Sequence, residues 1–185
     1  LIAGNGPPMV APWGSASPFF STNPLSFGVP AGEERPVVID MATSVSARGK
    51  IILAAKNGTE IPLGWAVDEE GNDTRDPSAA LKGVLLPFGG HKGYAVAVMV
   101  EVLSGLLSGA GYGPTMNEHY NRHDVPVNSG NLFAAVDVSR FVPLEEFKRE
   151  ADGMIRTIRS GKVRPGFGEI LLPGQIEARI RENRM

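Results

Sequence analysis

The stretch that most constrains the fold is residues 85–107, which read LLPFGGHKGYAVAVMVEVLSGLL. From residue 93 to residue 107, Tyr94 and Glu101 are the only ionisable side chains. This pattern is typical of a helix that is apolar on nearly all its faces and lies inside a hydrophobic core. We therefore expect a buried helix here, with the remaining elements packed around it.

The start of this helix has the features of an anion site. Gly89 and Gly90 allow close backbone approach, and His91 and Lys92 follow them directly. Unpaired N–H groups and the positive end of the helix dipole gather at a helix N-terminus, which suits a phosphate. The alternative is a plain turn with a solvated lysine, since neither a Walker P-loop nor GxGxxG occurs in the sequence. We interpret the stretch as half of a nucleotide-phosphate site.

Turn and periodicity signals divide the rest of the chain into short elements. A helix capped by Ser44 or Ser46 is expected to run to about residue 56. Further helices are predicted at 77–82 with Asp76 as the cap, at 143–159 and at 175–183. Strands are predicted at residues 1–5, 25–29 and 36–40, within 61–70, at 131–138 as a buried strand, and at 169–172.

Composition narrows the class of protein. The 185 residues are 42% hydrophobic and 21% charged, which is ordinary for a soluble globular protein. With a net charge of −2, the chain has no excess positive charge that would attract nucleic acid or an anionic membrane. No apolar run is long enough to cross a bilayer. The absence of cysteine excludes disulfides and thiolate sites, and it fits the reducing cytoplasm, where we expect the protein to act.

Two of the three histidines stand four positions apart, as metal ligands on a helix can. These are His119 and His123, with Glu118 and Asp124 beside them. The surrounding asparagines and a nearby proline favour a polar surface loop instead, and the HExxH order is not met. We therefore expect no metal site.

Three places where a predicted strand gives way to a turn and a helix are candidates for one shared site. They are residues 40–44, 89–92 and 173–175, and each offers backbone amides or polar groups. Asp40 ends a strand, where an acid can accept a ribose hydroxyl, or it can bond to nearby backbone N–H groups instead. If the three edges converge, they form one long cleft suited to an extended, doubly phosphorylated ligand such as a dinucleotide.

Five motifs in this chain together resemble the type-2 malate/L-lactate dehydrogenase family. They are APWG at residues 11–14, TNP at 22–24, VIDMATSVSARGKI at 38–51, LLPFGGHKGY at 85–94 and LLPG at 171–174. The resemblance implies a mixed-sheet α/β fold that is not a Rossmann fold, in agreement with the missing GxGxxG. It also implies an oxidoreductase, usually dimeric, that transfers a hydride between NAD or NADP and a small 2-oxo or 2-hydroxy acid.

The resemblance further implies a set of cofactor-binding residues. His91 and Lys92 would hold the cofactor's phosphates or ribose. The other contacts are expected from the strand near residue 40 and from the turn after residue 173, namely Pro36, Val37, Val38, Ile39, Asp40, Met41, Ala42, Gly174, Gln175 and Ile176. Asn5-Gly6 stands where the family often has Asn-Ser, and no basic cluster marks a 2′-phosphate pocket, so the choice between NAD and NADP stays open.

The expected division is a cofactor-binding α/β domain over residues 1–142, incomplete at its N-terminus, and a segment over 143–185 that returns to the cofactor site. In the family the catalytic histidine lies in a Ser-His-Gly motif near the N-terminus, and no such motif occurs in this sequence. We therefore expect the chain alone to be inactive, and to act as a homodimer or with the missing N-terminal segment. A non-catalytic nucleotide- or phosphate-binding module, and a structural fragment that folds only against a partner chain, stay open as alternatives.

Overall fold

The computed structural model describes residues 1–117 and 124–184. The chain divides into two compact units. Unit 1 comprises Leu1, Ser26–Asp40 and Ala134–Met185, and unit 2 comprises Ile2–Leu25 and Met41–Phe133. Each unit has a hydrophobic core of its own, and each is described by itself below.

The strands of unit 2 are short and pair mostly antiparallel. β1 (Ile2–Gly4) pairs with β6 (Asn131–Phe133), and β4 (Ala66–Val67) pairs with β5 (Val84–Leu85). A single parallel bridge joins Val10 to Leu85 in the described part of the chain, so both kinds of pairing meet in this unit. The result is a small mixed α/β arrangement without the long parallel sheet of a Rossmann fold, as predicted.

The helices of unit 2 begin and end near the predicted residues. α1 (Arg48–Asn57) ends at Gly58, whose left-handed conformation closes the helix. α2 (Pro77–Lys82) is capped by Asp76, whose carboxylate accepts the Ser78 N–H at 2.9 Å. The predicted cap of α1 was wrong, because the Ser44 hydroxyl donates to the Ser46 carbonyl instead, and Ala47 precedes the helix without a capping side chain.

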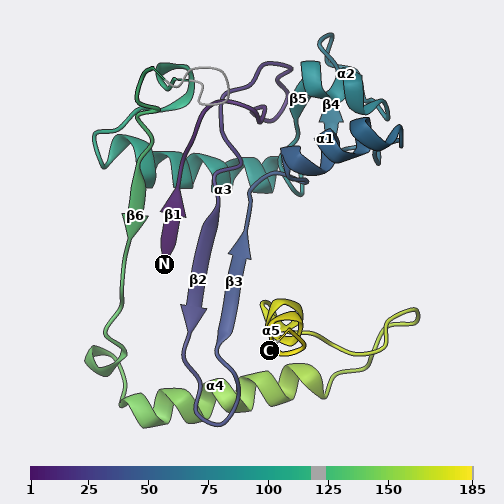
Figure 1. Ribbon diagram of the computed structural model, residues 1–185. Helices are drawn as coiled ribbons and strands as arrows, with labels where there is room; N and C mark the ends of the chain where they lie inside the picture. Colours follow the sequence, from purple (N-terminus) through teal and green to yellow (C-terminus); the bar gives the residue numbers. More distant parts are fainter. Residues whose placement is uncertain (118–123, 185) are drawn as a thin grey trace. The chain divides into compact units, whose positions relative to one another are not determined.

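α3 (His91–Glu101) is the central helix of unit 2, and it continues as the π-helical turn η1 (Val102–Leu106). α3 and η1 contact β1, and η1 also contacts β6 (Figure 1). The prediction that this helix, apolar on nearly all its faces, is buried in the core was wrong in part. The face that carries Ala97, Glu101 and Ser104 is buried, whereas apolar side chains on the rest of its surface are exposed, up to 69% at Leu107. The strands cover one side of the helix, and no segment of the described chain covers the other.

The core of unit 2 lies between α1, α2, the β4–β5 pair and the start of α3. Its fully buried side chains are Val10, Phe20, Ile51, Ile61, Ala66, Ala80, Leu85 and Ala97. A short 3₁₀ turn, η2 (Gly113–Thr115), follows the π-helical turn.

Unit 1 is built on a hairpin and one long helix. β2 (Leu25–Val29) and β3 (Val37–Met41) are hydrogen-bonded neighbours, each with one end residue in unit 2. α4 (Leu144–Arg159) follows the 3₁₀ turn η3 (Val138–Arg140), and α5 (Gln175–Glu182) ends the unit. The turn between the two strands reaches α4 (Figure 1). Val37, Ile155 and Leu172 form the buried core of this unit.

Two predicted strands differ in the structure. β6 covers only the first three residues of the predicted strand, although Ala134 still exchanges two backbone hydrogen bonds of 2.9 Å with Leu1, and Phe133 is exposed rather than buried. Residues 169–172 form no strand, because the backbone N–H of Leu172 is used by the following turn, where it donates to Gln175 Oε1 at 3.1 Å. No helix in the described part of the chain combines the length and apolar character that crossing a membrane requires.

Candidate functional site

The start of α3 is open to solvent. Gly89 and Gly90 both adopt positive φ angles, of 56° and 65°, which glycine accepts without strain. A Cβ added at Gly89 would meet no atom within 4 Å, so the backbone there can approach a ligand. His91 and Lys92 are exposed, and Lys92 has no ion-pair partner within residues 1–117 and 124–184. These residues can accept an anion at a helix N-terminus.

Trp13 of the APWG motif packs beside this helix start. A Cβ at Gly90 would lie 2.9 Å from the Trp13 ring, so glycine is required for this packing. The rings of Trp13 and His91 meet edge to face with centroids 6.2 Å apart. Two of the five sequence motifs are therefore adjacent in unit 2.

The segment after β3 is bonded to the chain that leads into α3. The Phe88 N–H donates to the Thr43 carbonyl at 3.0 Å, and the Val45 N–H donates to the Leu86 carbonyl at 2.9 Å. The Thr43 N–H donates in turn to the Thr22 carbonyl of the TNP motif at 2.7 Å. Thr43 and Val45, at the end of the first predicted edge, are thus hydrogen-bonded within unit 2 to the residues directly before the second edge, residues 89–92.

The third edge meets β3 in unit 1. Gly174 has a φ of 78°, and a Cβ there would lie 2.7 Å from the Val38 carbonyl oxygen, so the turn lies directly against the strand. The side chain of Gln175 folds back to the Leu172 N–H, and Ile176 is exposed. The predicted residues Pro36, Val37, Val38, Ile39 and Asp40 belong to this group, whereas Met41, Ala42, His91 and Lys92 belong to unit 2.

The carboxylate of Asp40 is exposed. It accepts no hydrogen bond from any residue that the structure describes, so the alternative of local closure onto backbone N–H groups is not observed. His119 and His123 lie outside the described residues. Within those residues, no cluster of three or more metal-ligating side chains is present.

The sequence reading missed a buried polar cluster around Glu101. This carboxylate is 4% exposed and accepts three N–H donors. They are Asn23 Nδ2 at 2.7 Å, Asn5 Nδ2 at 3.3 Å and the Gly113 N–H at 2.9 Å. Asn5 also accepts the Gly130 N–H at 2.8 Å. The cluster therefore ties separate segments of unit 2 to α3, and the lone acid in an apolar helix was its one visible signal.

Comparison with known proteins gives the family. A family model described as malate/L-lactate dehydrogenase matches residues 1–185. The chain belongs to this family. An L-sulfolactate dehydrogenase from Methanothermobacter thermautotrophicus is 42% identical over 178 residues, which cover 96% of this chain and 50% of that protein. A Δ(1)-pyrroline-2-carboxylate reductase from Ancylobacter novellus is 41% identical over 173 residues, which cover 94% of this chain and 50% of that protein.

Solved structures of the family have the same fold. The sulfolactate dehydrogenase from Methanocaldococcus jannaschii superimposes with a TM-score of 0.90 at 38% identity, covering 99% of this chain and 52% of that one. The malate dehydrogenase from Entamoeba histolytica also gives 0.90, at 30% identity, covering 99% and 54%. The chain thus spans about half the length of the family members that it matches. The predicted family and its non-Rossmann α/β fold are confirmed.

Proposed function

We propose that this chain forms the cofactor-binding part of an NAD(P)-dependent oxidoreductase that interconverts a small 2-oxo acid and its 2-hydroxy acid. Its relatives are named as dehydrogenases of malate and sulfolactate and as reductases of cyclic imino acids. One relative, from Chromohalobacter salexigens, is named as an NADP(+) enzyme. The observation that carries the proposal is the open N-terminus of α3, where His91 and Lys92 are exposed and neither forms an ion pair with any residue that the structure describes.

Each predicted residue has a role in this proposal. Lys92 and the free N–H groups at the start of α3 bind the cofactor's pyrophosphate, and His91 donates to a phosphate or ribose oxygen. Asp40 accepts a ribose hydroxyl, and the backbone of residues 36–42 and 174–176 lines the rest of the cofactor's length. When bound, NAD(P)H supplies the hydride for the carbonyl carbon. The convergence of the two residue groups on one cofactor is part of the proposal.

The proton for the carbonyl oxygen has to come from an acid near the substrate. We assign it to a histidine in the half of the family fold that these 185 residues do not cover, and we expect the chain alone to bind cofactor without turnover. The exposed apolar face of α3 and η1 supports pairing with that half or with a second copy in a homodimer. Residues 143–185 form the segment whose turn near Gly174 returns to the cofactor site. The protein works in the cytoplasm.

Fluorescence titration of the chain with NADH and NADPH tests the proposal. Saturable binding is expected, and Lys92→Ala should weaken it roughly tenfold because a charge-assisted contact to phosphate is lost. Lys56→Ala is the matched control, since it removes an exposed cation from the last turn of α1 in the same unit. Absence of binding, or equal binding by all three proteins, contradicts the proposal.

A second candidate is a non-catalytic nucleotide- or phosphate-binding module. The observation in its favour is that the start of α3 can bind a phosphate through its N–H groups and Lys92, and this binding needs no catalytic residue. Joining the upstream half of a relative to the chain separates the two functions. Recovery of 2-oxo acid reduction supports the enzyme, whereas a well-folded, cofactor-binding but inactive protein supports the module.

A further inference from the structure

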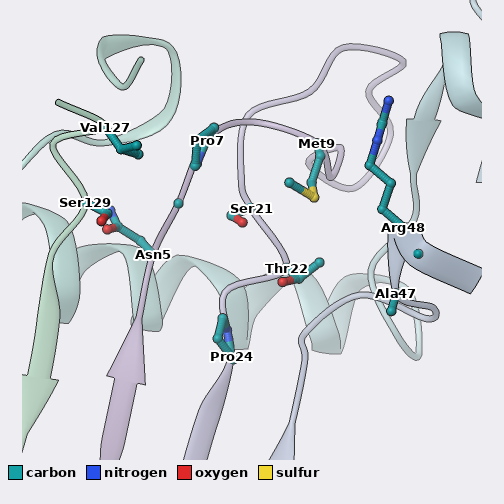
Figure 2. Close-up of a pocket in the computed structure, with 12 residues that line it drawn as sticks. Asn5, Pro7, Met9, Ser21, Thr22, Pro24, Ala47, Arg48, Val127 and Ser129 are labelled. Carbon is teal, nitrogen blue, oxygen red and sulfur yellow. The ribbon is translucent and has the colours of Figure 1, made fainter. Parts of the chain in front are cut away.

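The backbone of Asn23, in the TNP motif, adopts an unusual conformation. Its φ angle is 34°, and among the described residues other than glycine only Asn128 shares a positive value. Asparagine tolerates this left-handed region better than most residues, but a residue that precedes proline favours extended backbone, and Pro24 follows Asn23 directly. Thr22 and Pro24 flank this position just before β2 begins (Figure 2). A strained conformation of this kind persists only where the surrounding structure fixes it.

The contacts that fix Asn23 come from α3. Asn23 is fully buried, and its Nδ2 donates to Glu101 Oε2 at 2.7 Å and to the Ala97 carbonyl at 3.0 Å. Ala97 and Glu101 lie one turn apart on the buried face of this helix, so a single rigid element binds the side-chain amide twice. The carboxylate gives the stronger of the two bonds, because a charged acceptor strengthens a hydrogen bond. Thus α3 holds the turn at Asn23 in place.

The turn at Asn23 places the carbonyl oxygen of Thr22. This oxygen accepts two hydrogen bonds from Thr43, one from its N–H at 2.7 Å and one from its hydroxyl at 2.9 Å. The Thr43 carbonyl in turn accepts the Phe88 N–H at 3.0 Å. Because Thr43 is fully buried, water cannot replace the Thr22 carbonyl if the turn moves. The position of Thr43, and through it that of Phe88, therefore depends on Asn23.

Two groups of predicted cofactor-binding residues adjoin this chain of hydrogen bonds. Residues 41–42 directly precede Thr43, and residues 89–92 directly follow Phe88. The relative placement of these two groups within unit 2 thus depends on the bonds that Thr43 makes to Thr22 and Phe88.

We propose that Asn23 is a positioning residue for the cofactor. Held by Glu101, it fixes Thr43 and with it the relative placement of the two groups of cofactor-binding residues. This inference rests on the proposed function, which supplies the ligand. Asn23 itself does not touch the cofactor, because its side chain is fully buried against α3.

Amide hydrogen exchange of the ¹⁵N-labelled chain without ligand tests the placement. Alanine has no side-chain amide and disfavours a positive φ, so the turn should open locally in Asn23→Ala. In this variant the amides of Thr43 and Phe88 should exchange roughly tenfold faster, relative to the Ala80 amide of α2, than in the parent. Asn72→Ala, which removes an exposed asparagine amide from the same unit, is the control and should leave this ratio unchanged. Equal acceleration of all three amides overturns the proposal, because Asn23 would then contribute only to global stability.

NADH titration of four variants tests the consequence for the cofactor. Asn23→Ala should weaken NADH binding roughly tenfold. Asn23→Gly accepts the positive φ without strain but lacks the side-chain amide, so it replaces the alanine variant if that one does not fold, and it should weaken binding roughly threefold. Thr43→Val removes the hydroxyl bond to Thr22 and should also weaken binding roughly threefold. Thr43→Ser keeps that hydroxyl and should bind NADH like the parent.

The NADH affinity of the parent separates this proposal from the proposed function. If the parent binds NADH, and folded Asn23→Gly and Thr43→Val bind it equally well, the positioning role is overturned and the proposed function stands. If the parent binds no NADH, the proposed function fails, and the cofactor role of Asn23 fails with it.

Discussion

Two nearly buried carboxylates, one in each unit, are stabilised in different ways. Asp152 of α4 is 5% exposed and accepts the backbone N–H groups of Gly32, Glu33 and Glu34 at 3.0, 2.9 and 3.1 Å. Glu101 of α3 is 4% exposed and accepts two asparagine amides and one backbone N–H instead. Each carboxylate accepts three hydrogen bonds. Neither forms a salt bridge with a charged side chain in the described part of the chain.

The difference lies in where the donors come from. Asp152 takes all its donors from one turn, and Arg156 nearby pairs with Glu33 and Glu34 of that turn. Glu101 depends on Asn5 and Asn23, which are 96 and 78 positions away. The first arrangement fixes a single turn at the surface. The second joins distant segments in the interior, so its loss should disturb the whole of unit 2.

Glu101→Gln should have the largest effect. Glutamine keeps the shape but turns one acceptor into a donor, so at least one of the three N–H groups is left buried and unpaired. We expect a loss of about 2–4 kcal/mol in the free energy of unfolding, measured with urea. Glu145→Gln on α4 is the control. The Glu145 side chain is 81% exposed, so this variant should have nearly the same free energy of unfolding as the parent. Equal midpoints for the two variants would show that the interior cluster contributes nothing to stability.

Asp152→Asn should have a smaller effect that depends on pH. The backbone N–H of Glu33, then those of Glu34 and Gly32, lower the pKa of Asp152 below its ordinary value. Since the pKa is lower in the folded chain, this contribution is present above the unfolded pKa near 4 and is lost as pH falls through the folded value. The parent should therefore lose stability between about pH 5 and pH 3 more steeply than Asp152→Asn.

Other acids with lowered pKa values, such as Asp68 and Asp137, titrate in the same window. They are present in both proteins, so the difference between the two pH profiles isolates Asp152. Parallel profiles would contradict a depressed pKa at this residue.

Arg156→Ala should have the smallest effect. The guanidinium reaches Glu33 at 2.5 Å and Glu34 at 3.1 Å, but the side chains of Arg156 and Glu33 are 54% and 84% exposed, and ion pairs that are open to solvent contribute little. We expect a slight decrease in thermal midpoint at low salt that vanishes in 0.5 M NaCl, where the Debye length is only roughly 4 Å. A decrease that persists in high salt would mean that the turn depends on this pair and not on Asp152. Arg149→Ala, in a looser exposed pair with Glu150, is the control.

Where signals were local, the sequence predicted the fold closely. The strand expected at 25–29 and the helix expected at 77–82 have those bounds in the structure. The bounds of both elements are set by residues that are close in the chain, such as Asp76, which caps the helix, and the proline that follows it. The helix at 143–159 was predictable for the same reason, from an apolar stripe of which only Ile155 is fully buried; the stripe comprises Leu144, Phe147, Met154, Ile155 and Ile158.

Some misses have local causes, such as the Ser44 hydroxyl that donates to the Ser46 carbonyl instead of capping α1, whereas others depend on distant parts of the chain. The strand predicted at 131–138 is paired in the described chain as far as Ala134, which exchanges hydrogen bonds with Leu1 at the far end of the chain. Periodicity indicated that α3 is apolar all round, but it cannot show which faces the chain itself covers.

The α3 tip was predictable from the sequence because its parts are consecutive residues. Gly89, His91 and Lys92 are exposed, and Thr43 and Val45 are hydrogen-bonded to the residues that lead into α3. Their joint action with Gly174 on one ligand stays a prediction.

The measurement that tests this most directly is the map of amide shifts in the ¹⁵N-labelled chain on addition of NADH. The proposed site predicts that the largest saturable shifts fall on residues 89–92 and 174–176 together, with little change along α4. Saturation that leaves both of these segments unmoved, or shifts centred on residues 144–159, would contradict a cofactor site at the start of α3.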